Sequence, residues 1–259
     1  MSRNTFEVYA VKYATREGRR PENFHGGDPH DAPMTMDYYV WVLVSPDLTV
    51  VVDTGFTPEV AKRRGRTHLR CPAEALASLG IEVSTVPLVI LTHLHYDHIG
   101  NLDMFPKATF MVQEEEMAFW TGRYASRGHF RCHVEVEDVV WLARQNFGGR
   151  LRFVSGSERI APGVTVHRVG GHSAGLQIVE VETARGAVVV ASDACHFYEN
   201  VEDDRPFSIV TDVPEMYGAF DVVNALAETS DRVVPGHDPL VMERFESVLG
   251  LEGIAVRIA

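Results

Sequence analysis

Short hydrophobic runs, bounded by polar or turn-forming residues, recur along the chain and predict buried strands. Runs of about four to eight apolar, β-branched or aromatic residues between turn signals are typical of such strands. Ser45-Pro46-Asp47 separates two of the runs, which predicts a hairpin between them. The predicted strands cover residues 5–11, 38–44, 48–52, 86–90, 109–112 and 187–192, with others around Val164, Ile178 and Val233.

Segments with helical spacing lie between these strands. Residues 72–79 repeat apolar positions at helical intervals, and Gly80 follows them as a C-cap. Further helices are expected to begin near Gln113 and Val136, and to cover residues 214–228 and 239–249. Strands in clusters with helices between them predict an α/β protein built in layers. Periodicity alone does not choose among the arrangements of such layers.

Two polar segments do not fit this regular pattern. Residues 13–36 are rich in Gly, Pro and charged residues, and residues 119–133 combine aromatic residues and arginines within a weak helical pattern. Long irregular segments in a compact domain often border a functional site. We therefore expect one or both to wall a substrate pocket, the alternative being a solvated excursion.

Composition predicts an ordinary globular protein. Hydrophobic residues make up 45% of the chain and charged residues 23%, and a length of 259 residues is compatible with a single domain over residues 1–259. The chain has no apolar run near the roughly 18 residues that span a bilayer. Its first residues lack a signal-peptide core, so we expect no membrane association and a cytoplasmic location.

Charge and cysteine content narrow the chemistry. The formal net charge is −12, and an acidic surface repels phosphate backbones, so we expect a small neutral substrate and no nucleic-acid partner. The chain has 3 cysteines, an odd number, which argues against a disulfide framework. We expect Cys195 to be a small buried hydrophobe.

A histidine-rich loop follows the predicted strand at residues 86–90. It contains His93, His95, Asp97 and His98, and imidazole nitrogens with carboxylate oxygens suit divalent ions such as Zn²⁺. In an extended backbone, His93 and His95 share one face and can reach one ion. If a helix begins near Tyr96, Asp97 and His98 point elsewhere and can reach a second ion.

Three more candidate ligands stand singly, each at the end of a predicted strand. His172 follows a strand near Val164, Asp193 follows the apolar run at residues 187–192, and His237 follows the run near Val233. A rigid sheet can hold such loop residues in fixed positions. Together with the loop they form a candidate set of seven ligands. The other histidines are expected to be surface or core residues: His25, His30, His68, His129, His133 and His167.

The pattern His-x-His-x-Asp-His, followed by single His, Asp and His residues, resembles the metallo-β-lactamase superfamily. That resemblance implies an αββα sandwich and two metal ions. By analogy, one ion is held by His93, His95 and His172, the other by Asp97, His98 and His237, and Asp193 bridges them. Asp53-Thr54-Gly55 is similar to the superfamily's early Asp-Thr-Gly turn, whose Asp orients a ligand histidine through a hydrogen bond.

A pair of divalent ions indicates hydrolysis by a metal-bridging hydroxide. One ion polarises the substrate carbonyl and the other stabilises the leaving oxygen, so an ester, lactone, thioester or amide is a suitable substrate. Zn²⁺ is the expected ion, with iron, manganese and cobalt left open. Asp97 is expected to act as a proton shuttle as well as a ligand.

Within the superfamily, residues 193–207 resemble the N-acyl homoserine lactonases, which implies opening of a lactone ring. Tyr96 stands where that family often has Phe and is expected to line the substrate cleft. Lactonases commonly have a Tyr three residues after the bridging Asp, but this chain has His196 there. We expect His196 to take part in catalysis, since imidazole can donate a hydrogen bond. Tyr198 is a second candidate for the cleft. Whether the protein is a homodimer stays open.

Several alternatives share the same ligands. Thioester hydrolases of the glyoxalase II type bind glutathione through a basic C-terminal region, whereas residues 239–259 carry only Arg244 and Arg257 as basic residues. Sulfatases, phosphodiesterases and organophosphate hydrolases use the same hydroxide. A redox-active di-iron protein usually has a flavin domain, for which this chain has no room. A metal-binding module without catalysis is the remaining alternative.

Overall fold

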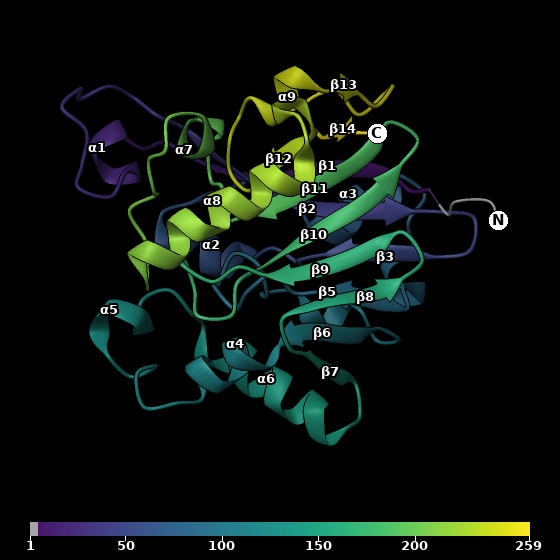
Figure 1. Ribbon diagram of the computed structural model, residues 1–259. Helices are drawn as coiled ribbons and strands as arrows, with labels where there is room; N and C mark the ends of the chain where they lie inside the picture. Colours follow the sequence, from purple (N-terminus) through teal and green to yellow (C-terminus); the bar gives the residue numbers. More distant parts are fainter. Residues whose placement is uncertain (1–4) are drawn as a thin grey trace.

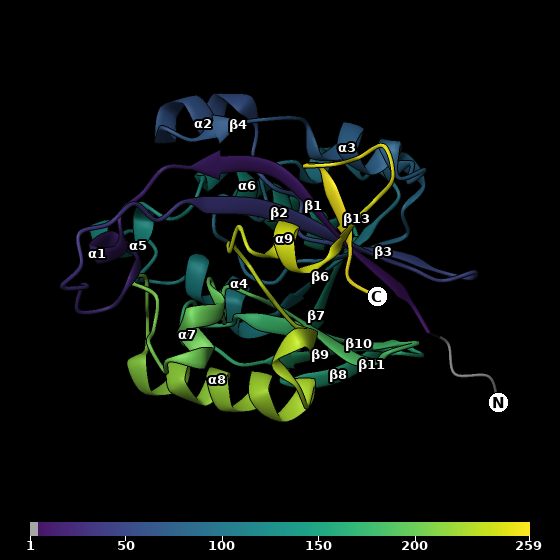
Figure 2. The same cartoon turned by 90° about the horizontal axis from the view of Figure 1, so that it is seen from above.

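Two β-sheets pack face to face, and helices cover the outer surface of each (Figures 1 and 2). The structure is a computed structural model that describes residues 5–259. Figure 2 shows α2 (Pro58–Arg64) and α3 (Pro72–Ser78) outside the first sheet and α8 (Val213–Ala227) outside the second. This is the αββα arrangement that the resemblance implied.

The first sheet is mixed and has nine strands in the order β13-β14-β1-β2-β3-β5-β6-β7, with β4 paired to β1. Neighbours from β3 to β7 run parallel, whereas β14, β1, β2 and β3 pair antiparallel. The strands are β1 (Glu7–Arg16), β2 (Met36–Val44), β3 (Thr49–Val52), β4 (Thr67–His68), β5 (Leu88–Ile90), β6 (Thr109–Gln113), β7 (Leu151–Val154), β13 (Glu246–Ser247) and β14 (Ala255–Arg257).

The second sheet has five strands in the order β12-β11-β10-β9-β8. Its members are β8 (Ser157–Ala161), β9 (Val164–Arg168), β10 (Gln177–Thr183), β11 (Gly186–Ser192) and β12 (Val233–Pro235). The remaining helices are α1 (Arg20–Asn23), α4 (Glu114–Trp120), α5 (Gly128–Arg131), α6 (Val136–Phe147), α7 (Tyr198–Glu202) and α9 (Val241–Arg244).

Alternation along the strands builds the three layers of core. In β2, Tyr38, Val40 and Val42 face the helices outside the first sheet, whereas Tyr39, Trp41 and Leu43 face the second sheet. In β11, Val188 and Val190 face the first sheet, whereas Val189 and Ala191 face α8. Successive side chains of a strand point to opposite faces, so strands buried on both faces read as continuous apolar runs.

In both sheets, candidate site residues lie in the loops that follow the carboxyl ends of parallel strands. β3 and β5 are parallel neighbours and lead into Asp53 and His93, and β11 and β12 are parallel neighbours and lead into Asp193 and His237. The carboxyl ends of parallel neighbours lie at the same edge of their sheet. The topology therefore gathers loop residues that are far apart in sequence.

Most predicted elements are confirmed, and the C-terminal helix is wrong. The predicted hairpin is β2–β3, and helices begin at Glu114 and Val136. The helix expected over residues 239–249 ends after four residues as α9, because Phe245 is extended with φ −114° and ψ 157°. The chain then returns as β13 and β14, which extend the first sheet beside β1. In residues 5–259, no helix is both long enough and apolar enough to cross a bilayer.

The loop before His172 packs closely against the first turns of α8. We therefore predict that any side chain at Gly171 lowers the stability of the protein. Gly171 has φ +81°, and a Cβ there would lie 2.6 Å from the backbone of Met216. Gly171→Ala should lower the free energy of unfolding by about 2–5 kcal/mol, because positive-φ strain and overpacking add. Denaturant unfolding measures the change.

Gly218→Ala is the matched control in α8, where a Cβ would meet nothing within 4 Å. It should raise the free energy of unfolding by about 0.5–1 kcal/mol, because Gly weakens a helix interior. Equal changes in the free energy of unfolding for Gly171→Ala and Gly218→Ala would contradict the close approach of Gly171 to Met216.

Candidate metal centre

The seven candidate ligands meet at the edge where the two sheets converge, and all are buried. They form two groups in which one ligand atom from each residue lies within 4.8 Å of the others. The first group is His93, His95, His172 and Asp193. The second is Asp97, His98 and His237.

Asp193 faces both groups with different oxygens. Its Oδ2 lies 3.1 Å from Nε2 of His172 and 3.7 Å from Nε2 of His93. Its Oδ1 lies 3.2 Å from Nε2 of His98 and 3.1 Å from Nε2 of His237. One carboxylate thus stands between the two sets of imidazoles, as the resemblance implied.

Asp97 completes the second group. Its Oδ2 lies 3.9 Å from Nε2 of His98 and 3.8 Å from Nε2 of His237. In the first group, Nδ1 of His95 lies 2.9 Å from Nε2 of His172. The sequence spacing therefore works as expected, because His93 and His95 point to one group while Asp97 and His98 point to the other.

The donor set fits a pair of divalent ions. Nε2 of His93 and Nε2 of His98 are buried and form no hydrogen bond within residues 5–259, and a buried polar atom without a partner costs free energy. Burial holds the pKa of His93 and of His95 well below the usual histidine range, so both rings are neutral at pH 7. Neutral imidazoles and carboxylates are the ligand forms that Zn²⁺ and related ions bind.

Asp53 forms the hydrogen bond to a candidate ligand histidine that the resemblance implied. Its Oδ2 accepts a hydrogen bond from Nδ1 of His98 at 2.7 Å and one from the Thr92 hydroxyl at 2.8 Å. Its Oδ1 accepts the Thr92 backbone N–H at 2.8 Å. Because Nδ1 of His98 is turned to Asp53, Nε2 is the nitrogen that faces Asp97 and Asp193.

Backbone carbonyls orient two further rings. Nδ1 of His172 donates to the carbonyl of Ile209 at 2.8 Å, and Nδ1 of His237 donates to the carbonyl of Asp37 at 2.9 Å. Each ring therefore directs Nε2 toward Asp193. Any residue type supplies a carbonyl, so the sequence carried no signal for these contacts.

A cleft of about 210 Å³ opens over the ligands. Tyr96 lines it as expected, and its hydroxyl accepts a hydrogen bond from Nε of Arg66 at 3.1 Å. The Arg64 guanidinium lies over the Tyr96 ring, 3.8 Å from its centroid. Arg64 is paired with Glu135, whereas Arg66 has no carboxylate within 4 Å in the described part of the chain. The cleft thus has a partly uncompensated positive rim.

His196 lies in the cleft, stacked on Phe207. The ring centroids are 3.6 Å apart with planes 11° from parallel, and Nε2 of His196 lies 3.0 Å from Oδ2 of Asp193. His196 also forms a third possible ligand group with Asp193 and His237. Burial lowers the pKa of His196 to about 3, so the ring is neutral at pH 7.

Tyr198, which we expected to line the cleft, lies outside it. Helix α7 begins at Tyr198, so the backbone turns there and carries the ring into the core between the sheets. The ring lines a separate cavity with Asp238 and Leu240, and the Arg244 guanidinium lies 3.7 Å from its centroid. Its distance from the cleft removes it from the candidate site residues.

The irregular segments border the cleft only at their ends. Arg16 and Met36 line it from the first segment, and Cys132 and His133 from the second. His133, which we expected to be an ordinary histidine, lies with its ring centroid 5.2 Å from that of His95. A lone histidine far from the ligand loop gave no sign of this placement.

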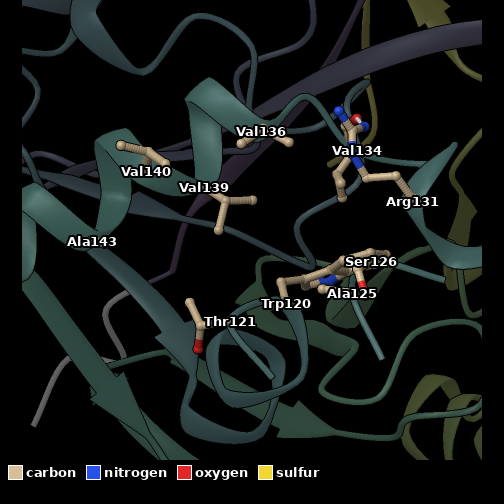
Figure 3. A pocket seen from close by; sticks show the side chains of 10 residues that line it. All are labelled: Trp120, Thr121, Ala125, Ser126, Arg131, Val134, Val136, Val139, Val140 and Ala143. Carbon is tan, nitrogen blue, oxygen red and sulfur yellow. Dashed lines mark hydrogen bonds between the residues drawn. The ribbon is translucent and has the colours of Figure 1, made fainter. Parts of the chain in front are cut away.

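Figure 3 shows an apolar cavity of about 320 Å³. Trp120 forms one wall, and its ring lies edge-on to His95 with centroids 5.6 Å apart. The segment from Arg131 to Val134 borders both spaces, since its ends line the cavity and its middle lines the cleft. The cavity lining is Trp120, Thr121, Ala125, Ser126, Arg131, Val134, Val136, Val139, Val140 and Ala143.

Sequence comparison identifies a family for this chain and relatives of modest sequence identity. A sequence model of the metallo-beta-lactamase superfamily matches residues 36–237. The chain is 29% identical over 176 residues to the N-acyl homoserine lactonase AiiB of Agrobacterium fabrum, covering 62% of this chain and 63% of that protein. It is 30% identical over 167 residues to the human metallo-beta-lactamase domain-containing protein 1, covering 64% of this chain and 52% of that protein. The matched region is thus less than two thirds of the length of either relative.

Comparison of structures shows the same fold. An N-acyl homoserine lactone hydrolase, solved with the product N-hexanoyl-L-homoserine at its catalytic metal centre, superposes with a TM-score of 0.74. The match covers 95% of this chain and 98% of that one at 18% sequence identity. At this level of sequence identity, the structural match shows a shared fold only.

Asp53 offers a test of the site that does not depend on turnover. Asp53→Asn keeps the shape of the side chain but replaces one of the oxygens that accept from His98 and Thr92. We expect metal affinity to fall about 10–100-fold, because removal of a ligand's orienting partner typically costs that much. Competition with a chromophoric chelator measures it.

Asp47→Asn, an exposed change in the β2–β3 turn, is the control and should leave affinity unchanged. Wild-type affinity in Asp53→Asn would show that Asp53 does not support the metal centre.

Proposed function

The chain belongs to the metallo-beta-lactamase superfamily, and on that basis we propose that it is a metal-dependent hydrolase that opens lactone rings. N-acyl homoserine lactones are the proposed substrates, and Zn²⁺ is the proposed ion at both positions. The observation that carries the proposal is the placement of Asp193, with one oxygen toward each group of imidazoles. Similarity to N-acyl homoserine lactonases supports the choice of substrate.

Each group of side chains would hold one ion. His93, His95 and His172 would bind the first, and Asp97, His98 and His237 the second, with Asp193 shared. When bound, two such ions supply Lewis acidity at the substrate carbonyl and lower the pKa of a water molecule. This chemistry requires no serine or cysteine nucleophile.

The chain's own residues would orient the substrate and move the proton. Tyr96 and Arg66 present a hydroxyl and a guanidinium at the rim, where they can hold polar oxygens of the substrate. His196 stands where lactonases commonly have a tyrosine, and its stacking on Phe207 keeps the ring over Asp193. Asp97 lines the cleft, and its carboxylate is placed to take up a proton and return it to the leaving alcohol oxygen.

The apolar cavity of Figure 3 would receive the acyl chain. The metal cleft is small and lined mostly by polar and charged residues, so it suits the lactone ring rather than a hydrocarbon tail. The cavity adjoins it across the Arg131–Val134 segment and is lined by Val134, Val139 and Ala143. Burial of each methylene stabilises a complex by about 0.8 kcal/mol.

A pH-indicator assay of the metal-loaded protein tests the proposal. The panel contains butanoyl-, hexanoyl- and decanoyl-homoserine lactones, a glutathione thioester and a phosphodiester. We expect acid release from the lactones at rates well above those for the other compounds. Hydrolysis of the thioester or the phosphodiester without lactone turnover would replace the proposal by one of the alternative hydrolases. Absence of all turnover would favour a metal-binding module.

Filling the cavity should remove the preference for long acyl chains. Ala143→Phe projects a ring into the cavity from α6, far from the ligands. If each methylene that the cavity receives is worth about fourfold in KM, the KM for the decanoyl substrate should rise at least tenfold. The KM for the butanoyl substrate should stay the same.

Asn146→Phe, at an exposed position of the same helix, is the control and should change neither KM. A uniform rise in KM for all chain lengths in Ala143→Phe would place the acyl chain elsewhere.

A further inference from the structure

Glu116 is a fully buried carboxylate that the proposed chemistry does not use. It is the third residue of α4, directly after β6, and its exposed fraction is 0%. Within residues 5–259, no Lys, Arg or His lies within 4 Å of it as an ion-pair partner. A buried carboxylate without a cation is costly unless hydrogen bonds compensate for the lost hydration.

Hydrogen-bond donors surround both oxygens of Glu116. Oε1 accepts the Leu94 backbone N–H at 2.9 Å and the indole Nε1–H of Trp120 at 2.7 Å. Oε2 accepts the Gly175 backbone N–H at 2.7 Å and the hydroxyl of Ser173. An ionised carboxylate can accept about four hydrogen bonds, so this one is saturated.

Three of these donors, on Leu94, Ser173 and Gly175, belong to the two loops that carry the first ligand group. Leu94 lies between His93 and His95, and Ser173 follows His172. The two loops come from different sheets, and Glu116 is bonded to both. Its carboxylate therefore links the loop of His93 and His95 to the loop of His172.

Close packing leaves these loops little freedom to adjust. A Cβ at Gly175 would lie 2.3 Å from the backbone nitrogen of Glu116, so the His172 loop lies directly on the start of α4. Trp120, held by Glu116, packs edge-on against His95 with centroids 5.6 Å apart. A shift of the Glu116 carboxylate would therefore move both the His172 loop and Trp120, which packs against His95.

Glu116 is one of three consecutive glutamates, and its neighbours face solvent. Glu114 and Glu115 are exposed, and Glu115 pairs with Arg168. In sequence, this acidic triplet is typical of a solvated first turn of a helix. The structure separates the inward glutamate from the other two.

We propose that Glu116 is a positioning residue that tunes the affinity of the metal site formed by His93, His95 and His172, and leaves the other site to Asp53. The inference rests on the metal binding of the proposed function but not on the reaction. Asp53 contacts His98 of the second group, so each site has its own buried carboxylate.

Glu116→Gln tests this role with little change of shape. The amide group has one acceptor oxygen, so its NH₂ would face donors that Glu116 now satisfies. We expect the ion at the first site to bind about 10–100-fold more weakly, and the ion at the second site to keep its affinity. In a chelator competition, the wild-type protein should bind two equivalents of Zn²⁺ tightly. The Glu116→Gln variant should bind one equivalent tightly and one weakly.

The d–d absorption of the Co²⁺-substituted protein provides a spectroscopic readout. It should change for one of the two ions, which a general loss of stability would not produce. Glu115→Gln is the matched control on the same helix and should retain two tight equivalents and the wild-type Co²⁺ spectrum.

Ser173→Ala removes one of the hydrogen bonds without altering α4, and it keeps the test decisive if Glu116→Gln does not fold. It should weaken the same site by a smaller factor. Equal weakening of both sites, or two tight equivalents in each variant that folds, would overturn the inference. Site-selective weakening in a protein that hydrolyses no lactone would uphold the role of Glu116 and refute the proposed reaction.

Discussion

Electrostatic balance around the Asp193 carboxylate is the constraint on which the site depends. Five imidazole Nε2 atoms, those of His93, His98, His172, His196 and His237, lie within 3.7 Å of its two oxygens, and Asp97 adds a second carboxylate beside them. Imidazole nitrogens that converge on carboxylates in a buried space need a positive charge between them. A pair of divalent cations would supply this charge, and the ends of the strands would hold the ligands in fixed positions.

The αββα sandwich brings the residues of this cluster together. Parallel strands in each sheet end at a common edge, and the two edges face each other, so candidate ligands as far apart in sequence as His93 and His237 meet. The loops are then fixed by buried carboxylates from other elements. Asp53 holds His98 and the loop at Thr92, while Glu116 holds the loops at Leu94 and Ser173.

Local patterns predicted what depends on local chemistry. Continuous apolar runs identified β2 and β11 because both of their faces are buried, and the spacing within the histidine-rich loop identified two directions of ligation. The C-terminal region was misjudged, since pairing of β14 with β1 outweighs the helical spacing of residues 239–249. Tyr198 was misplaced because the turn into α7, which redirects its side chain, has no distinctive sequence signal. Glu116 and His133 lie near the ligands through tertiary contacts, and both are ordinary polar residues in sequence.

Anomalous X-ray diffraction from crystals grown with Zn²⁺ tests the central claim most directly, because it locates the ions among their ligands. Data collected on both sides of the zinc absorption edge should show two peaks about 3.5–4 Å apart. One should lie among His93, His95 and His172, the other among Asp97, His98 and His237, with Asp193 between them. A single peak, or peaks outside these two groups of side chains, would contradict the account.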